Sequence, residues 1–129
     1  MISLRLQLKV GTDSRIGHGK VRLLEEIGRT GSISAAARAL GMNYRRGWDL
    51  VDHMNKAFGR PVVVGTTGGL GGAELTDLGR DIVARWRALE AEVSRIATPH
   101  LCALDELVVS SPVEVSDGVP VAARVVEKD

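Results

Sequence analysis

The stretch that decides the fold is residues 31–59, which read GSISAAARALGMNYRRGWDLVDHMNKAFG. It predicts two helices, about 34–40 and 43–57, joined by a tight turn at Gly41, where glycine allows a backbone conformation that other residues resist. Ala37 lies four residues before that glycine and is small enough for the two helices to cross closely. The stretch therefore predicts a helix-turn-helix.

The second of these helices is expected to begin with a basic turn. Ser34 and Asn43 carry side chains that cap helix N-termini, so we expect the two helices to begin near them. The first turn of the second helix then carries Tyr44, Arg45 and Arg46. A basic helix end directly after a tight turn is the arrangement that enters the DNA major groove. The alternative is a helical pair that only packs.

The distribution of charge favours a nucleic-acid partner for the half of the chain that holds this motif. Residues 1–60 contain 11 Lys/Arg against 5 Asp/Glu, a balance of +6, and residues 61–129 contain 6 against 11, a balance of −5. Phosphate binding needs a local positive potential rather than a basic total. A solvated, salt-bridged surface would produce the same counts and remains the alternative.

The segments on either side of the motif predict a fold that is mainly α with a small β component. Residues 2–10 alternate apolar and polar side chains, as a half-buried strand does, and a helix with one apolar face follows at about 16–29. Downstream, two short strands at 62–64 and 73–75 enclose a glycine-rich loop, which is where a winged helix carries its wing. The fold class is a winged helix-turn-helix with an N-terminal strand, unless the loop is only a mobile hairpin tip.

A long helix is expected over residues 76–97, capped by Thr76, with Asp77 and Asp81 at its positive end and Pro99 after it. Its apolar residues recur at steps of four and three, as in a coiled-coil seam. A seam of this length favours a symmetric homodimer over packing on the chain's own core alone. The predicted dimerisation residues are Ile82, Trp86, Leu89, Val93 and Ile96.

This organisation predicts one large domain and one short tail. Residues 1–97 form the winged helix with its dimerisation helix. Residues 98–129 form a short tail that either adds a β-hairpin, with strands near 107–109 and 119–126, or stays partly disordered. The N-terminal segment is neither a signal peptide nor a membrane span, so we expect a cytoplasmic protein.

No catalytic, metal or cofactor site emerges from the residues. The glycine-rich loop is followed by Ala73 and Glu74 rather than by the Lys-Ser/Thr of a phosphate-binding loop. The three histidines lack metal-ligand spacing, and no nucleophile elbow or close acidic pair is present. The single cysteine, Cys102, cannot form an internal disulfide. We expect no enzymatic activity, no cofactor and no metal.

The candidate contacts to DNA fall into two groups. Gly47 stands where this motif usually buries an aliphatic side chain, so the recognition helix is expected to lie close to its support. The expected base-reading residues are Asn43, Tyr44, Arg45, Arg46 and Asp49. Trp48 is expected either to brace the wing, which we favour, or to stack on the sugar-phosphate backbone. The expected phosphate contacts are Ser32, Ser34, Lys56, Arg60, Thr66 and Thr67.

Two runs of sequence resemble the N-terminal domain of the ModE-type molybdate-responsive transcriptional regulators: TGSISAAARALGMNYRRGWDLVDHMN at 30–55 and TTGGLGGAELTDLGRDIV at 66–83. The resemblance extends over about residues 2–97. The run GSISAAARALG is also similar to LysR-type regulators, but the Trp48-Asp49 pair and the paired glycines of the wing favour the ModE type. The resemblance implies a winged helix that dimerises through the elements flanking the helix-turn-helix.

The chain departs from this family after the long helix. Family members continue into a molybdate-binding region of two small barrel-like modules, and the tail here is too short for one of them and lacks the family's Ser-Ala-Arg-Asn type of oxyanion motif. We therefore expect a homodimeric, sequence-specific DNA-binding regulator for which tight molybdate binding is not expected. The alternative is a winged-helix interaction or dimerisation module that does not read DNA sequence.

Overall fold

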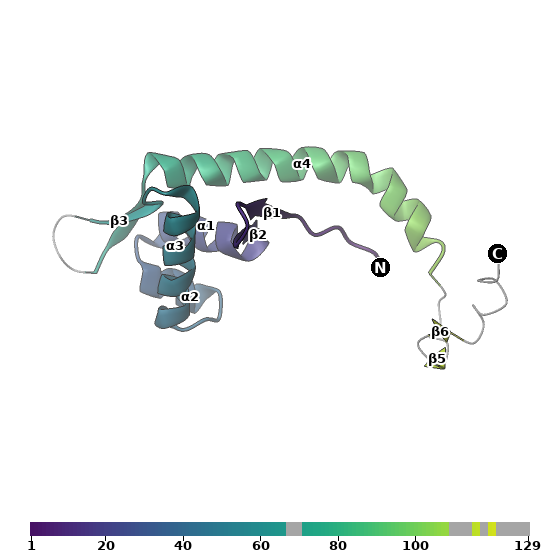
Figure 1. The fold of residues 1–129 in the computed structure, drawn as a ribbon, viewed down its shortest axis with the longest axis horizontal. Helices are drawn as coiled ribbons and strands as arrows, with labels where there is room; N and C mark the ends of the chain where they lie inside the picture. Colours follow the sequence, from purple (N-terminus) through teal and green to yellow (C-terminus); the bar gives the residue numbers. More distant parts are fainter. Residues whose placement is uncertain (67–70, 109–114, 117–118, 121–129) are drawn as a thin grey trace. The chain divides into compact units, whose positions relative to one another are not determined.

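The computed structural model describes residues 1–66, 71–108, 115–116 and 119–120 (Figure 1). Two units are described separately, Arg5–Arg95 and a second unit formed by Met1–Leu4 with Ile96–Asp129. The elements, in chain order, are β1 (Gln7–Val10), β2 (Ser14–Gly17), α1 (His18–Thr30), α2 (Ile33–Ala39), α3 (Tyr44–Phe58), β3 (Val63–Gly65), β4 (Ala73–Leu75), α4 (Asp77–Asp105), β5 (Val115–Ser116) and β6 (Val119–Pro120).

The N-terminal strand is one half of a hairpin. β1 pairs with β2 in antiparallel register, with Leu8 opposite Ile16 and Lys9 opposite Arg15, and Gly11 takes a positive φ of 67° in the turn. The prediction of a single strand followed by a helix from residue 16 was therefore wrong. Ile16 lies in β2, and its side chain points into the core from this extended strand and is only 2% exposed. The helix begins two residues later, at His18.

The core of the first unit is built from one apolar face of each helix. Residues three and four apart on a helix lie on the same side, so α1 and α3 each present a continuous stripe. Burying such side chains contributes roughly 1.5–3 kcal/mol each. The largest fully buried side chains are Val21, Leu23, Leu24, Ile27, Val51, Met54 and Val62.

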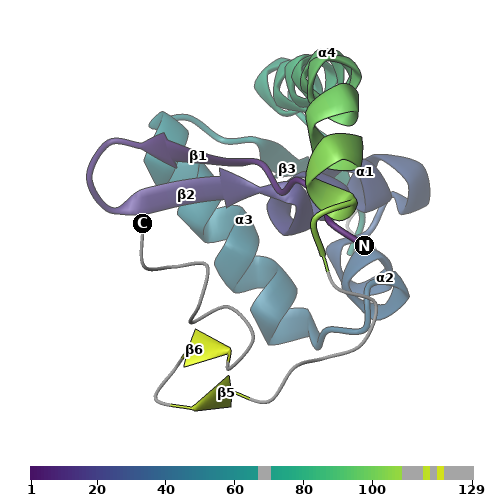
Figure 2. The same cartoon turned by 90° about the vertical axis from the view of Figure 1, so that its right-hand side faces the viewer.

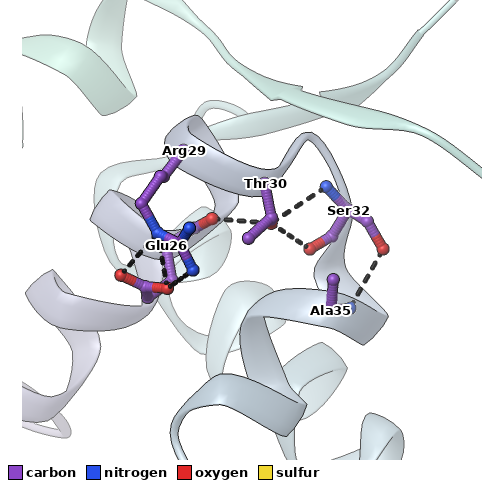
Figure 3. Close-up of polar contacts among 5 residues, drawn as sticks. All are labelled: Glu26, Arg29, Thr30, Ser32 and Ala35. Atoms are coloured by element: carbon purple, nitrogen blue, oxygen red, sulfur yellow. Dashed lines mark hydrogen bonds and ion pairs between the residues drawn. The ribbon is translucent and has the colours of Figure 1, made fainter.

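A set of side-chain hydrogen bonds shapes the turn from α1 to α2 (Figure 3). The Thr30 hydroxyl donates to the Glu26 carbonyl at 2.7 Å, and the Ser32 hydroxyl oxygen accepts the Ala35 N–H at 3.0 Å. Ser32 is therefore the N-cap of α2, and the prediction that Ser34 caps it was wrong, because Ser34 lies in the first helical turn. The cap satisfies one of the free N–H groups at the helix start.

The wing is the hairpin of β3 and β4, which the sequence predicted, and Val63 pairs with Leu75 in it. Two hydrogen bonds anchor its base. The Val62 N–H donates to the Asn55 side-chain oxygen of α3 at 2.8 Å, and the Ala73 N–H donates to the Gly31 carbonyl at 2.8 Å. The wing is thus fixed to the third helix and to the turn before the second.

The start of α4 is fixed to the same connection. The Thr76 hydroxyl accepts the Gly79 N–H at 3.1 Å and donates to the Pro61 carbonyl at 2.8 Å, so the predicted cap is confirmed. The Thr76 N–H donates to the Val62 carbonyl at 3.0 Å. Farther along, Arg87 forms a part-buried hydrogen-bonded ion pair with Glu25, which ties α4 to α1.

The prediction that Pro99 ends this helix was wrong, because α4 continues to Asp105 with Pro99 inside it. A proline cannot donate a backbone hydrogen bond to the carbonyl four residues earlier. Pro99 is exposed, so water can satisfy that carbonyl. The boundary expected at residue 97 falls inside α4. Leu107 and Val108 are not in a strand, and β5 and β6 form a short hairpin. Residues 109 and 121–126 of the expected tail strands lie outside the described residues.

Candidate nucleic-acid interface

The outer face of α3 is open along its length. The inner face is formed by Gly47, Leu50, Val51 and Met54, all buried. The N-cap prediction for Asn43 is confirmed, since its side-chain oxygen accepts the Arg46 N–H at 2.8 Å. The predicted base-reading residues are all exposed: Asn43, Tyr44, Arg45, Arg46 and Asp49.

Close packing against α2 sets the position of α3. A Cβ atom on Gly47 would lie 3.1 Å from the Ala37 Cβ and 3.4 Å from the Ile33 Cγ2. These spacings confirm the prediction that the recognition helix lies close to its support. Gly41 completes the turn with a positive φ of 74°, where residues with a Cβ are strained.

Trp48 faces the wing. Together with Tyr44 and Ile33 it lines a hollow of about 140 Å³ whose far wall is formed by residues 63–65 and 71–73 of the wing. The Trp48 indole N–H donates to the Tyr44 hydroxyl, and the two rings meet edge to face with centroids 6.3 Å apart. This placement agrees with the interpretation that Trp48 braces the wing, although its ring is still 44% exposed.

The arginines at the start of α3 are unpaired, whereas a cation near its end is paired. Within the described part of the chain, no carboxylate forms an ion pair with Arg45 or Arg46. Lys56 pairs with Asp52 at 2.9 Å across one helical turn. An exposed pair of this kind contributes little to stability, so it can give way to a phosphate.

The remaining residues predicted to contact phosphates differ in their exposure to solvent. Arg60 is exposed just beyond α3, and Thr66 is exposed at the base of the wing loop. Ser32 and Ser34 are half-buried at the start of α2, with the Ser32 oxygen already engaged in capping. Thr67 lies outside the described residues.

Lys20 of α1 is a cation that the sequence analysis did not single out. Its ammonium donates to the Arg15 carbonyl at 2.6 Å. The pKa of Lys20 lies below its ordinary value, first because the group is partly buried and second because Arg46 places a like charge near it. Lys20 and Arg46 are far apart in the chain, so no local pattern could have paired them.

The predicted dimerisation residues are placed differently from one another. Trp86 is only 3% exposed and belongs to the chain's own core, so its assignment to a free seam was wrong. Ile82 also packs partly on that core. Leu89 and Ile96 are exposed and Val93 is half-buried. Beside Leu89 runs an apolar groove of about 460 Å³, lined in part by Leu8, Val10, Phe58, Ile82 and Leu89.

Two classes of site are absent from the residues that the structure describes. No group of three or more His, Cys, Asp or Glu side chains there could hold a metal ion. None of the described helices has the length and apolarity needed to cross a membrane.

Comparison with known proteins shows which families this architecture is similar to. The model of the LysR family of bacterial regulatory helix-turn-helix proteins matches residues 19–80. The molybdenum-pterin-binding protein MopB of Rhodobacter capsulatus is 47% identical over 87 residues, which cover 66% of this chain and 32% of MopB. The molybdenum transport protein ModE of Azotobacter vinelandii is 43% identical over 90 residues, covering 68% and 33% of the two chains. The winged helix of this chain is homologous to that of the ModE-type regulators.

The similarity to another ModE protein covers more of this chain. The DNA-binding transcriptional dual regulator ModE of Escherichia coli K12 is 33% identical over 113 residues, which cover 86% of this chain and 41% of that protein. The chain thus matches between about a third and two fifths of the length of these relatives. The resemblance inferred from residues 30–55 and 66–83 is confirmed.

Solved structures support the fold of this domain. The CbnR_DBD–DNA complex aligns with a TM-score of 0.57 and 16% identity, covering 69% of this chain and 99% of that one. VV2_1132, a LysR family transcriptional regulator, aligns with a TM-score of 0.54 and 16% identity, covering 68% of this chain and 29% of that one. At this identity the likeness establishes the winged helix-turn-helix fold alone.

Proposed function

We propose that this chain is the sequence-specific DNA-binding part of a transcriptional regulator and that it acts as a homodimer. The observation that carries the proposal is the exposed first turn of α3, where Arg45 and Arg46 have no carboxylate partner among the described residues, on a helix that a close crossing holds in place. The homology to ModE-type regulators supports it. Because LysR and ModE proteins are regulators, no enzymatic activity is proposed.

The proposed binding mode places α3 in the major groove. Arg45 projects away from the buried face of the helix and would grip guanine through its O6 and N7 atoms. Asn43, Tyr44 and Asp49 lie on the same exposed turns. Contacts to phosphates would come from side chains around this helix and the wing: Ser32, Ser34, Lys56, Arg60, Thr66 and Thr67.

Selection of bound duplexes from a random pool tests this function. We expect enrichment of a site whose two halves are related by two-fold symmetry and lie one helical turn, about 10 base pairs, apart. Binding without enrichment would show that the chain contacts only the backbone. Absence of binding would favour the interaction module that does not read DNA.

The proposed dimer uses the groove beside α4. A second copy of α4 would cover the exposed Leu89 and the half-buried Val93 and fill the apolar groove that continues to Leu8 and Phe58. Exposed apolar surface of this extent is most simply covered by the same face of another copy.

Leu89→Glu is expected to convert the dimer into a monomer while retaining helical content, because a carboxylate in the seam would have to be desolvated. Val93→Glu should act in the same way. Ala91→Glu is the control, since Ala91 is exposed on the opposite side of α4 and should leave the dimer intact. Light scattering at micromolar concentration measures all three. A wild-type chain that is already monomeric there would contradict the dimer.

This 129-residue chain is expected not to bind molybdate tightly. A tetrahedral oxyanion needs several converging N–H donors together with a positive side chain. The sequence after Ile96 holds two Lys/Arg against six Asp/Glu and has no glycine-rich or serine-rich cradle beside the basic residues. Calorimetric titration with molybdate and with tungstate should show no micromolar binding. Heat of binding at that level would reveal an oxyanion site in the chain.

A further inference from the structure

Lys20 occupies a fixed position at the corner between β2 and α1. Its ammonium donates a hydrogen bond to the Arg15 carbonyl at 2.6 Å, so the positive charge has a defined position. β2 also contacts α3, which brings this corner next to the recognition helix (Figure 2).

Arg46 and Trp48 lie on opposite flanks of α3, the recognition helix. Successive residues of an α-helix are rotated by about 100°, so Arg46 and Trp48 project about 200° apart. Trp48 lines the hollow beside the wing. Arg46 therefore projects to the opposite flank, which is where Lys20 lies close enough for the two charges to interact.

The two cations on this flank have no compensating carboxylate among the described residues. Among the described residues, no carboxylate forms an ion pair with either Lys20 or Arg46, and Asp49, one turn along α3, pairs with neither. Partial burial of Lys20 and the like charge of Arg46 both disfavour the charged ammonium. An anion seated between the two side chains would favour the charged ammonium and so offset both effects.

The shape of DNA indicates which anion fits. A helix in the major groove, about 12 Å wide, is bordered by a phosphate backbone on each side. With the wing on one flank of α3, the other flank faces the second backbone. A phosphodiester there would meet the Arg46 guanidinium and the Lys20 ammonium, and the Arg15 carbonyl already holds the ammonium in place.

We propose that Lys20 and Arg46 together hold one backbone phosphate on the flank of α3 opposite the wing. The inference rests on the proposed DNA-binding function and deepens it. Arg46 is then a positioning residue that fixes the register of the helix, and Arg45 is left as the arginine that reads a base. The contact is independent of sequence, because a phosphate carries no base identity.

The test compares the affinity of variants for the selected duplex and for a random duplex of the same length, by fluorescence anisotropy over a range of salt concentrations. Lys20→Gln should weaken binding to both duplexes by the same factor and reduce the slope of log K against log[salt] by about 0.9, the value for one phosphate contact. Lys20→Arg should retain the wild-type slope. Arg22→Gln is the matched control, because Arg22 lies two residues farther along α1, about 200° away around the helix, and is exposed.

The double variant Lys20→Gln/Arg46→Gln sharpens the test. If the phosphate is held only when both side chains are present, the double variant loses about 0.9 of slope, as each single variant does, whereas two separate contacts would lose about twice that value. Thermal unfolding of each variant shows that the fold is retained.

Three results would overturn the proposal. The first is a slope of log K against log[salt] that is steep in the wild type and unchanged in Lys20→Gln. That result would contradict the phosphate contact but would leave the proposed DNA-binding function intact. The second is a loss confined to the selected duplex, which would make these residues base readers. The third is a wild type that shows no salt-dependent DNA binding, which removes the proposed function and this inference together.

Discussion

Gly79→Ala should lower the free energy of unfolding by about 1–3 kcal/mol, the usual cost of forcing extra volume into a packed site. Helix propensity alone would predict stabilisation, because alanine is ordinarily a better helix former than glycine. The expected change in stability therefore has the opposite sign. A Cβ atom on Gly79 would overlap the carbonyl oxygen of Val62, which already accepts the Thr76 N–H. That carbonyl belongs to the backbone connection before β3 and cannot rotate away as a side chain could.

The control for this prediction is Gly19→Ala. Gly19 lies in the first turn of α1, and a Cβ atom there would have nothing within 4 Å. Alanine at this position should therefore stabilise the domain slightly, by up to about 1 kcal/mol. Chemical denaturation monitored by circular dichroism compares the two variants. A Gly79→Ala chain as stable as the wild type would show that α4 does not dock on Val62 as described.

Arg45→Ala should weaken binding to the selected duplex by about 5- to 150-fold, equivalent to about 1–3 kcal/mol for one two-pronged arginine–guanine contact. Binding to a random duplex should fall much less, since the lost contact reads a base. Arg45 is exposed and has no ion-pair partner in the part of the chain that the structure describes, so its removal breaks no ion pair there.

The control is Arg22→Ala, which removes one positive charge from an exposed position of α1. It should leave the preference for the selected duplex unchanged. Equal losses on both duplexes for Arg45→Ala would move this residue to the phosphate contacts. Unchanged binding to both would count against α3 as the recognition helix.

The helix-turn-helix and wing were predictable because their signals are local. Gly41 marks a turn that needs a positive φ, Asn43 caps the helix that follows it, and Thr76 caps the last helix. Each of these residues acts within three or four positions of itself, so the chain around it is sufficient to identify its role.

Other features depended on distant parts of the chain. The four-residue strands of the N-terminal hairpin give too short an alternation to separate Ile16 from the helix after it. The heptad spacing of α4 could not distinguish a partner from the chain's own core, and Trp86 belongs to the core. The proximity of Lys20 to Arg46 arises only when α1, β2 and α3 pack together.

The most direct test of DNA reading by this domain is the anisotropy of labelled duplexes titrated with the wild-type chain across salt concentrations. We predict that log K falls linearly with log[salt] at a slope of several units, about −0.9 for each phosphate contact. At any one salt concentration, the selected duplex should bind at least about 10³-fold more tightly than a random one. Equal affinity for both duplexes at every salt concentration, or no binding at micromolar protein in low salt, would contradict a sequence-specific DNA-binding function.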